Sequence, residues 1–332
     1  MKPWMVFVVL CLVSCSLVGC GKAPTSLRNG ELKILTFNVW GLYGVADSIQ
    51  KRFKEIPGRI DATGADIVTF QEVWHFELRE YLIWEMKNRG YLYSADNTGV
   101  GVQTVPPARG ILGNGLLIVS RYPLIGGTDR FDFSTFTRPE EYFARKGAIH
   151  TVVRLPDFED VDVYAAHLGA AQFDDSKRDF NSQEENGIYV QSKELGSFIE
   201  STHHSSAVVL GVDMNSHVFK YSNVEQRYTQ EPSRPWEFLV NGLGLLDTMN
   251  SLLGPEAGTQ PTYTKLNPYV ANGIFKNQPS ECGDYVFFSQ EKRSPRLVLK
   301  KSQIVFDQPV GPDKVYLSDH FGVLSSFRVV AN

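Results

Sequence analysis

The stretch YLSDHFGV, residues 316–323, joins an aspartate and a histidine to the start of the last strand-like run, Phe321 to Val330. Neighbouring side chains of a strand point to opposite faces, so Asp319 can bind a cation while His320 accepts or donates a proton. An Asp-His pair alone is more often a solvated turn. The expectation of a site here depends on further polar residues beside other strand-like runs: Asn38, Glu72, His167, Asp213, Asn215 and Asp284.

Strand-like runs recur along the whole chain. LKILTFN (32–38), DIVTFQ (66–71) and SAVVLGVDMN (206–215) are apolar enough to be strands buried on both faces. GAIHTVVRL (147–155) and DVYAAHL (162–168) read as the two arms of a hairpin. These runs predict a fold that is rich in β-structure.

Helix-like segments are inserted between pairs of strands. The pattern predicts helices from Asp47 as N-cap to about Ala62, from Leu78 to a stop at Gly90, and from Ser182 to Thr202. Residues 216–235 are polar and read as a long surface loop. We therefore expect the α/β (α+β) class, as a four-layered α/β/β/α sandwich of two mostly antiparallel sheets packed face to face with helices outside.

The first twenty residues have the character of an export signal. An apolar run from Trp4 to Val13 follows Lys2 and is short for a membrane span, and small residues precede Cys20. LVGC (17–20) resembles the bacterial lipobox, which implies a signal over residues 1–19, lipidation of Cys20 and a tether over residues 20–30. The chain is expected to be exported and anchored to a bacterial membrane by lipid; the alternative is an ordinary secretory signal and a secreted protein.

Composition bounds the remaining possibilities. The chain has 332 residues, 42% of them hydrophobic and 21% charged, which is typical of a globular protein with a sizeable core. Its formal net charge is −4 and no dense Lys/Arg stripe occurs, which argues against a general nucleic-acid binder. Cys282 is the one cysteine beyond Cys20, so we expect it to be a small buried residue without an intrachain disulfide.

The ligand types favour a hard cation. The sequence has no CxxC and no HExxH, and oxygen donors such as Glu72 and Asp319 suit Mg²⁺ better than Zn²⁺. Because no serine or cysteine nucleophile is evident, water activated beside a metal is the expected nucleophile.

Each polar position also has an ordinary structural reading. Asn38 can be a turn former, and His167 a core histidine bonded to backbone. Asp213 and Asn215 are two apart and share a face if the chain is extended there, whereas an Asx turn is the alternative. Asp284 could orient an imidazole and fix its tautomer.

Taken in order, these motifs resemble those of the Mg²⁺-dependent endonuclease/exonuclease/phosphatase superfamily, and within it the neutral sphingomyelinases. The resemblance covers about Leu32 to Val330, and Val212 departs from it by standing where glycine is common. The motifs, in chain order, are FNVWGL, FQEVW, GNGLLIVSRYPL, RKGAI, AHL, VDMNS, GDYV and LSDH.

The resemblance implies roles for individual residues. Glu72 would bind Mg²⁺, or Mn²⁺ or Co²⁺ in its place, with Asn38 and Asp319 nearby. Asp213 and Asn215 would orient the phosphate and the attacking water. His320, held by Asp284, would act as general base or stabilise the phosphorane, and His167 would be the acid for the leaving alkoxide. Lys146 and Asn114 are candidates for phosphate contact, although solvated or turn roles fit them equally well.

The resemblance also implies a function. The expected enzyme is a phospholipase C-type phosphodiesterase that releases ceramide and a phosphorylated head group from sphingomyelin, or a related phosphosphingolipid, at a membrane surface. The aromatic stretch FDFSTFTRPEEYF (131–143) either enters the bilayer or forms an edge strand with its rings in the core. The alternatives are a secreted deoxyribonuclease of the same superfamily and, from another class, a catalytically dead surface adhesin. No specific nucleic acid is expected, and a monomer is favoured.

Overall fold

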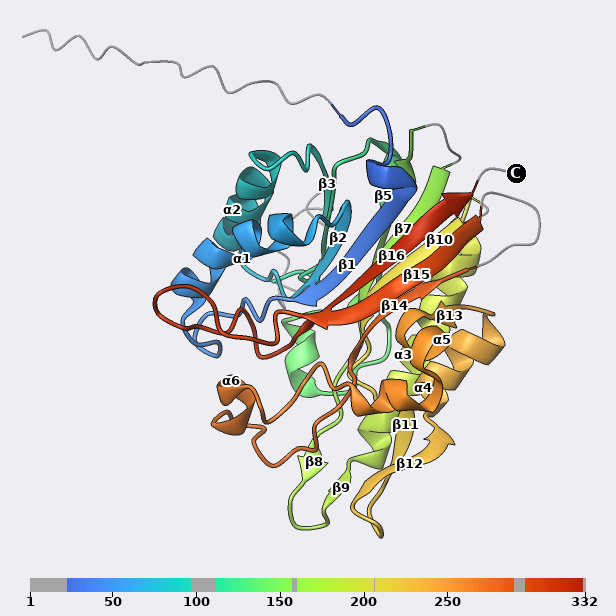
Figure 1. Cartoon of the computed structure of the whole chain (residues 1–332). Helices are drawn as coiled ribbons and strands as arrows, with labels where there is room; N and C mark the ends of the chain where they lie inside the picture. Colours follow the sequence, from blue (N-terminus) through green and yellow to red (C-terminus); the bar gives the residue numbers. More distant parts are fainter. Residues whose placement is uncertain (1–22, 97–111, 157–159, 206, 290–295, 331–332) are drawn as a thin grey trace, which may run out of the picture.

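The computed structural model describes residues 23–96, 112–156, 160–205, 207–289 and 296–330. The expected export signal and Cys20 lie outside these residues. Within them, the first of two large sheets has the strand order β15-β16-β1-β2-β4-β3 (Figure 1). Its strands are β1 (Glu31–Asn38), β2 (Ile67–Gln71), β3 (Tyr93–Asp96), β4 (Leu117–Ser120), β15 (Arg296–Val305) and β16 (Gly322–Val330).

The second large sheet packs against the first and has the order β13-β14-β10-β7-β6-β5. Its strands are β5 (Leu124–Asp132), β6 (Gly147–Arg154), β7 (Asp160–His167), β10 (Ala207–Asp213), β13 (Leu246–Asp247) and β14 (Asp284–Phe288). In the first sheet only β1 and β2 run parallel, and in the second only β7 and β10, among the described strands. The predicted mostly antiparallel arrangement is confirmed.

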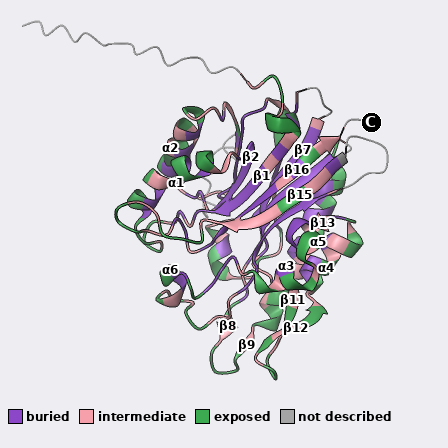
Figure 2. Cartoon of the chain, in the orientation of Figure 1, coloured by how far each residue is buried: buried purple, intermediate pink, exposed green. Residues whose placement is uncertain are grey.

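Helices cover the outer faces of both sheets. α1 (Ile49–Thr63) and α2 (Phe76–Lys87) pack on the first sheet, and α3 (Ser182–Thr202) packs on the second. The short helices α4 (Arg234–Glu237) and α5 (Thr248–Leu253) lie beside the second sheet (Figure 1). The expected four-layered sandwich is therefore confirmed, and its strands form the buried centre in Figure 2.

The alternation of β1 shows why the layers form. Leu32 and Ile34 join the apolar cluster between the two sheets, whereas Leu35 and Phe37 join the cluster under α1 and α2. A strand that is buried on both faces needs apolar residues at successive positions. The sequence of β1 therefore fixes it as a central strand.

The two sheets approach closely where β1, β2 and β10 lie together. A Cβ atom on Gly211 of β10 would overlap the side chains of Thr36 and Thr69 from the first sheet. Gln71 donates a hydrogen bond of 3.0 Å to Thr36 Oγ1 in the same buried seam. Because Gly211 has no side chain, the ends of β1 and β10 are brought near each other.

Two local predictions are wrong. The N-cap of α1 is Ser48 rather than Asp47, whose carbonyl instead accepts a hydrogen bond from Arg52. Residues 216–235, expected to be a surface loop, contain a hairpin of β11 (Phe219–Ser222) and β12 (Arg227–Pro232). The predicted helix over 182–202 coincides with α3.

The aromatic stretch 131–143 divides into two parts. It begins in β5, the edge strand of the second sheet, where Phe131 stacks on Phe198 of α3 and Phe133 is buried just beyond the strand. Phe136 and Phe143 are exposed. The edge-strand interpretation is thus correct for the first part only.

Smaller elements extend beyond the sheets at one end. They are the hairpin β8–β9 (Phe173–Asp174 and Asp179–Phe180), the hairpin β11–β12, and the one-turn helix α6 (Pro268–Ala271), all in the lower part of Figure 1. No helix among the described residues is both long enough and apolar enough to cross a membrane.

Candidate active site

Strand ends from both sheets meet at one edge of the sandwich. The parallel neighbours β1 and β2 end there at Asn38 and Gln71, and the parallel neighbours β7 and β10 end there at His167 and Asp213. The antiparallel strands β14 and β16 begin at the same edge. The topology therefore gathers seven predicted site residues that are far apart in sequence: Asn38, Glu72, His167, Asp213, Asp284, Asp319 and His320.

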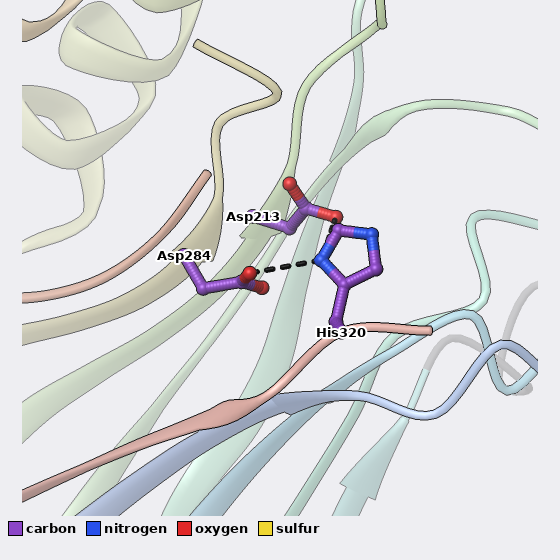
Figure 3. A group of neighbouring side chains, drawn as sticks. All are labelled: Asp213, Asp284 and His320. Carbon is purple, nitrogen blue, oxygen red and sulfur yellow. Dashed lines mark hydrogen bonds and ion pairs between the residues drawn. The ribbon is translucent and has the colours of Figure 1, made fainter. Parts of the chain in front are cut away.

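The buried centre of this site is formed by Asp213, Asp284 and His320 (Figure 3). His320 Nδ1 lies 2.8 Å from Asp284 Oδ2 and 3.8 Å from Asp213 Oδ2. An imidazole that donates its Nδ1 proton to a carboxylate has a fixed orientation and keeps Nε2 for another partner. The expected pairing of Asp284 with a histidine is present.

Asn38 and His167 approach Asp213 from either sheet. Asn38 Nδ2 donates a hydrogen bond of 2.8 Å to Asp213 Oδ2, and His167 Nε2 lies 3.4 Å from the same oxygen. Lys146 Nζ is 2.6 Å from His167 Nε2. Because an ammonium group can only donate, His167 Nε2 is the acceptor in this shorter contact, and Lys146 Nζ is 3.3 Å from Nδ1.

Glu72 and Asp319 form a second acidic part of the site. Glu72 is only 19% exposed in its side chain, and its Oε1 lies 3.9 Å from His167 Nε2. The pKa of Asp319 is raised to about 6, chiefly by burial; the charge of His320 opposes the rise, that of Glu72 adds to it and that of Arg52 opposes it. Two carboxylates that repel each other in a half-buried site fit a hard divalent cation.

A second group of residues also fits a metal on geometry alone. One potential ligand atom each of Asp213, Asp284 and His320 lies within 4.8 Å of the others. His320 Nδ1 is already hydrogen-bonded to Asp284, however, so these residues satisfy one another without a cation. The chemistry favours Glu72 and Asp319 as the cation ligands, because both offer carboxylate oxygens that are not engaged by His320, whereas the other group includes an imidazole nitrogen that is already hydrogen-bonded.

Burial and neighbouring charges shift the other ionisable groups. Burial raises the pKa of Asp213 to about 7, and Asp284 adds to this effect. Burial lowers the pKa of His167 well below its usual value, and the charges of Lys146 and His320 lower it further. Burial acts in the same direction on His320, but Asp284, Asp213 and Asp319 outweigh it and raise its pKa well above the usual value.

Three site segments have unusual backbone. Trp40, Glu72 and Asn215 have φ values of 47°, 61° and 47°, in the left-handed region that favours glycine. Such strain costs about 1–3 kcal/mol per residue and clusters at functional sites. The three residues follow the ends of β1, β2 and β10, so each chain turns sharply as it leaves its strand.

The left-handed backbone at Asn215 decides between the two readings of this segment in favour of the Asx turn. Asp213 and Asn215 do not share a face of an extended chain; instead Asp213 Oδ1 accepts a 3.0 Å hydrogen bond from Asn215 N in an Asx turn. Asn215 Nδ2 donates to Leu168 O at 3.0 Å, next to His167. The turn, rather than strand alternation, keeps the two residues together.

Asn114 and Lys146 lie on adjoining segments. Arg145 N donates to Gly113 O at 2.9 Å, and this contact joins the two segments. Lys146 reaches the site through His167, whereas Asn114 Nδ2 is directed to Asp132 at 3.5 Å and its Oδ1 accepts from Leu116 N. The structure brings Lys146 into the cluster and gives Asn114 a supporting place beside it.

Sequence reasoning missed Arg52, which is fully buried beneath the site. Its guanidinium donates to the carbonyl oxygens of Asp47, Val39, Leu317 and Trp40, at 2.7 to 2.8 Å. The signal was present, because Arg52 stands on the apolar stripe of α1 between Ile49 and Ile56, where a charge needs partners.

Asn267 supports the same segment from the other side. Its Nδ2 donates to the carbonyl oxygens of Ser318 and Asp319, at 2.7 and 3.2 Å. It also caps α6 by accepting from Tyr269 N. No pattern in the sequence distinguishes this asparagine from an ordinary turn residue.

The sequence matches the endonuclease/exonuclease/phosphatase family over residues 35–320. The chain belongs to this family. The match begins in β1 and ends at His320, so it includes all seven residues gathered at the site.

Two curated relatives are named as enzymes that act on sphingolipids. The chain is 29% identical over 197 residues to a putative neutral sphingomyelinase of Drosophila melanogaster, covering 56% of this chain and 39% of the relative. It is 24% identical over 149 residues to an inositol phosphosphingolipids phospholipase C of Schizosaccharomyces pombe, covering 42% and 31%. The matched region is thus well under half the length of either relative. The resemblance to the sphingomyelinase branch is confirmed.

Solved structures with different substrates share the fold. Sphingomyelinase C from Streptomyces griseocarneus superposes with a TM-score of 0.61 at 16% identity, covering 91% of this chain and 99% of that one. TDP2 of D. rerio, complexed with a single-strand DNA product, superposes with a TM-score of 0.60 at 16% identity, covering 90% and 98%. These likenesses show the sandwich fold alone.

Proposed function

We propose that this chain is a metal-dependent phosphodiesterase of phospholipase C type that hydrolyses sphingomyelin or a related phosphosphingolipid. The proposal rests mainly on one observation: Asp213, Asp284 and His320 form a buried cluster of ionisable side chains, and Glu72 and Asp319 lie beside it. The names of the two curated relatives support a sphingolipid substrate.

Glu72 and Asp319 are the proposed ligands of Mg²⁺, for which Mn²⁺ or Co²⁺ could substitute. When bound there, the cation would supply positive charge for the phosphate oxygens and a more acidic water. Asn38, the third residue expected near the metal, donates from Nδ2 to Asp213 at 2.8 Å and accepts at Oδ1 from Trp40 N at 2.9 Å, so its proposed role is to hold Asp213 in place. Asp213 and Asn215 would orient the attacking water and the phosphate.

His320 has two possible roles, base or stabiliser of the phosphorane. The raised pKa favours an imidazolium that stabilises developing negative charge through Nε2, while Asp284 holds Nδ1. A cation at Glu72 and Asp319 would lower this pKa by repulsion and make the base more available.

The leaving alkoxide needs a proton, for which His167 is the proposed acid. Burial and the charges of Lys146 and His320 lower its pKa, so the imidazole is neutral. Its N–H would give a proton to the alkoxide while Lys146, whose Nζ lies 2.6 Å from Nε2, returns a proton to the ring and is left as a neutral amine. We therefore propose that Lys146 and His167 act together, with Lys146 also available for a phosphate oxygen.

Residues 31–332 are proposed to form one catalytic domain, preceded by the export signal, the lipid-bearing Cys20 and the short tether. Together with exposed Phe136 and Phe143, this anchor would keep a monomeric enzyme near its lipid.

The test measures phosphocholine release from sphingomyelin vesicles with Mg²⁺ or with EDTA. We expect Mg²⁺-dependent release from the wild type and a loss of at least about 100-fold in His320→Ala. His203→Ala serves as the control, because His203 is an exposed residue at the end of α3. Plasmid DNA nicked by a protein that leaves every lipid intact would instead identify the deoxyribonuclease alternative, and inactivity on both would favour the adhesin.

A further inference from the structure

A cavity of about 460 Å³ opens beside the proposed catalytic site. Its walls come from the start of α3, the hairpin β11–β12 and the start of α4, which lie together in the lower right of Figure 1. Asn215 and Ser216 form the wall nearest Asp213. A group attached to a phosphate at Asp213 and His320 is therefore within reach of this cavity.

One wall of the cavity is aromatic. Phe180 and Tyr221 have ring centroids 5.6 Å apart, and Tyr221 and Tyr228 are separated by 5.3 Å. Tyr228 stacks on His217 at 3.7 Å. Burial lowers the pKa of His217 to about 4, so this imidazole is neutral and extends the aromatic surface.

The charges on the cavity are mainly negative. Its lining contains four carboxyl groups, from Glu185, Glu231, Glu237 and Glu281, against the cations Lys220 and Arg234. Burial raises the pKa of Glu281 to about 7. Burial also raises the pKa of Glu185, with Asp179 adding to the rise and Lys220 opposing it. The three carboxyl groups other than Glu281 outnumber the two cations.

Both cations are already engaged. Lys220 Nζ lies 3.7 Å from Glu231 Oε2. The guanidinium of Arg234 lies 3.9 Å from the ring centroid of Tyr189, and Arg234 donates to Asn186. The partners of Arg234 are neutral, so its charge still offsets one carboxylate of the lining. Among the described residues, Glu185 and Glu237 form no ion pair with either cation, and the lining keeps an excess of negative charge.

We propose that this cavity binds the cationic head group of the substrate, a quaternary ammonium such as that of choline. The proposal depends on the lipid phosphodiesterase activity proposed above and names the head group that the site selects. Aromatic faces attract a quaternary ammonium ion through cation–π interaction. The ion has no N–H to donate, but nearby carboxylates still attract its positive charge. A neutral polyol head group such as inositol gains neither effect.

The test compares two substrates that differ only in the head group. Initial rates are measured on sphingomyelin and on inositol phosphoceramide in neutral detergent micelles with Mg²⁺, for wild type and for the double variant Glu185→Gln/Glu237→Gln. We expect kcat/KM on sphingomyelin to fall roughly tenfold, mainly through KM, while kcat/KM on inositol phosphoceramide stays within about twofold.

A second variant and a matched control accompany this measurement. Tyr221→Leu removes a ring from the wall while keeping an apolar side chain, and we expect the same selective loss. Glu225→Gln removes a carboxylate from the turn of the same hairpin outside the cavity, and its substrate ratio should equal that of wild type. Inhibition by free phosphocholine should weaken in the first two variants by the same factor as kcat/KM.

The outcomes separate the two proposals. Hydrolysis of sphingomyelin with an unchanged ratio between the substrates in both cavity variants would overturn the head-group assignment and leave the lipid activity standing. A ratio in wild type that favours inositol phosphoceramide would also overturn it. Failure of wild type to hydrolyse any phosphosphingolipid would overturn the activity and the assignment together.

Discussion

At the scale of single residues, Arg52 is the link between the site and the core. Its buried guanidinium holds the carbonyl oxygens of Val39 and Trp40 after β1 and of Leu317 before Asp319. These segments carry two of the proposed active-site residues, Asn38 and Asp319. Arg52 is thus a positioning residue that does not itself contact the reacting atoms.

Arg52→Lys should therefore destabilise the fold and loosen the site. A lysine cannot reproduce the planar fork, so buried carbonyl oxygens lose partners and the free energy of unfolding should fall by about 3 kcal/mol. We expect a higher Mg²⁺ concentration for half-maximal activity as well. Urea unfolding and Mg²⁺ titration measure both effects. Arg59→Lys, on the exposed side of α1, is the matched control and should change unfolding by less than about 0.5 kcal/mol.

Asp162 is a buried carboxylate whose hydrogen-bond partners, His150, His204 and Ser205, do not belong to the proposed site. It accepts hydrogen bonds from His150 Nε2 at 2.7 Å and from the backbone of His204 at 2.9 Å. Burial alone would raise its pKa, but the hydrogen bonds of His150, Ser205 and His204 together hold the pKa below the usual value. The carboxylate therefore stabilises the start of β7 against the end of α3.

The lowered pKa of Asp162 gives a pH-dependent prediction. A group whose pKa is depressed in the folded state stabilises the fold above its unfolded pKa of about 4, and this contribution disappears as the pH falls through the folded value. Asp162→Asn should lower the free energy of unfolding by about 2 kcal/mol near pH 7. The difference from wild type should shrink below about pH 4. A difference that is constant with pH would contradict it; Asp160→Asn, which pairs with exposed Arg154, is the control.

At the scale of elements, the segment after β7 is held by a tight contact. Gly169 follows His167 and Leu168, and a Cβ atom there would overlap the side chains of Thr137 and Glu141. Gln191 of α3 accepts from Gly169 N at 2.6 Å and donates to Glu141 at 3.1 Å. Helix α3 thereby fixes the loop that leads to Lys146 against the end of β7.

Gly169→Ala should separate this loop from the strand. The overlap must be relieved by movement of Thr137 and Glu141, which should cost about 1–3 kcal/mol of stability and reduce activity through the Lys146–His167 contact. Gly127→Ala is the matched control, because its added Cβ would meet open space. Thermal unfolding and turnover measure the two effects, and equal behaviour of the two variants would show that the contact is soft.

The elements also show how far the sequence could predict the structure. The central strands and α3 were predictable because apolar runs, and apolar residues that recur on one helix face, are local signals. The hairpin β11–β12 was not, because its rings, Tyr221 and Tyr228, pack on Phe180 and His217 from other segments. The role of Arg52 likewise depends on carbonyl oxygens that are distant in sequence, such as that of Leu317. The Asx turn at Asn215 depends on a backbone angle that the residue types alone do not determine.

At the scale of the whole molecule, folding brings negatively charged carboxylates that are far apart in sequence close together at the site. Burial is the main cause of the raised pKa of Asp319, and repulsion by the negative charge of Glu72 adds to it. The chain has a net charge of −4, so no excess of positive charge compensates them globally. In the absence of a cation, the folded state therefore bears a penalty that the unfolded chain does not have.

A divalent cation at these carboxylates should convert the penalty into stability. Ligand binding at about 100 times its Kd adds about 2.7 kcal/mol, so saturating Mg²⁺ should raise the Tm of wild type by about 5 °C relative to EDTA. In EDTA, the Tm of Glu72→Gln should equal or exceed that of wild type, because one of the two repelling charges is gone. Mg²⁺ should no longer raise the Tm of this variant.

Glu80→Gln, on the exposed side of α2, should keep the full Mg²⁺ shift and shows whether a change of net charge alone matters. A Glu72→Gln protein that still gains about 5 °C from Mg²⁺ would place the cation elsewhere, with Asp213, Asp284 and His320 as the next candidates. In that case Asp284→Asn should abolish the shift instead. Because unfolding is measured without substrate, the result locates the cation independently of the lipid that the enzyme cleaves.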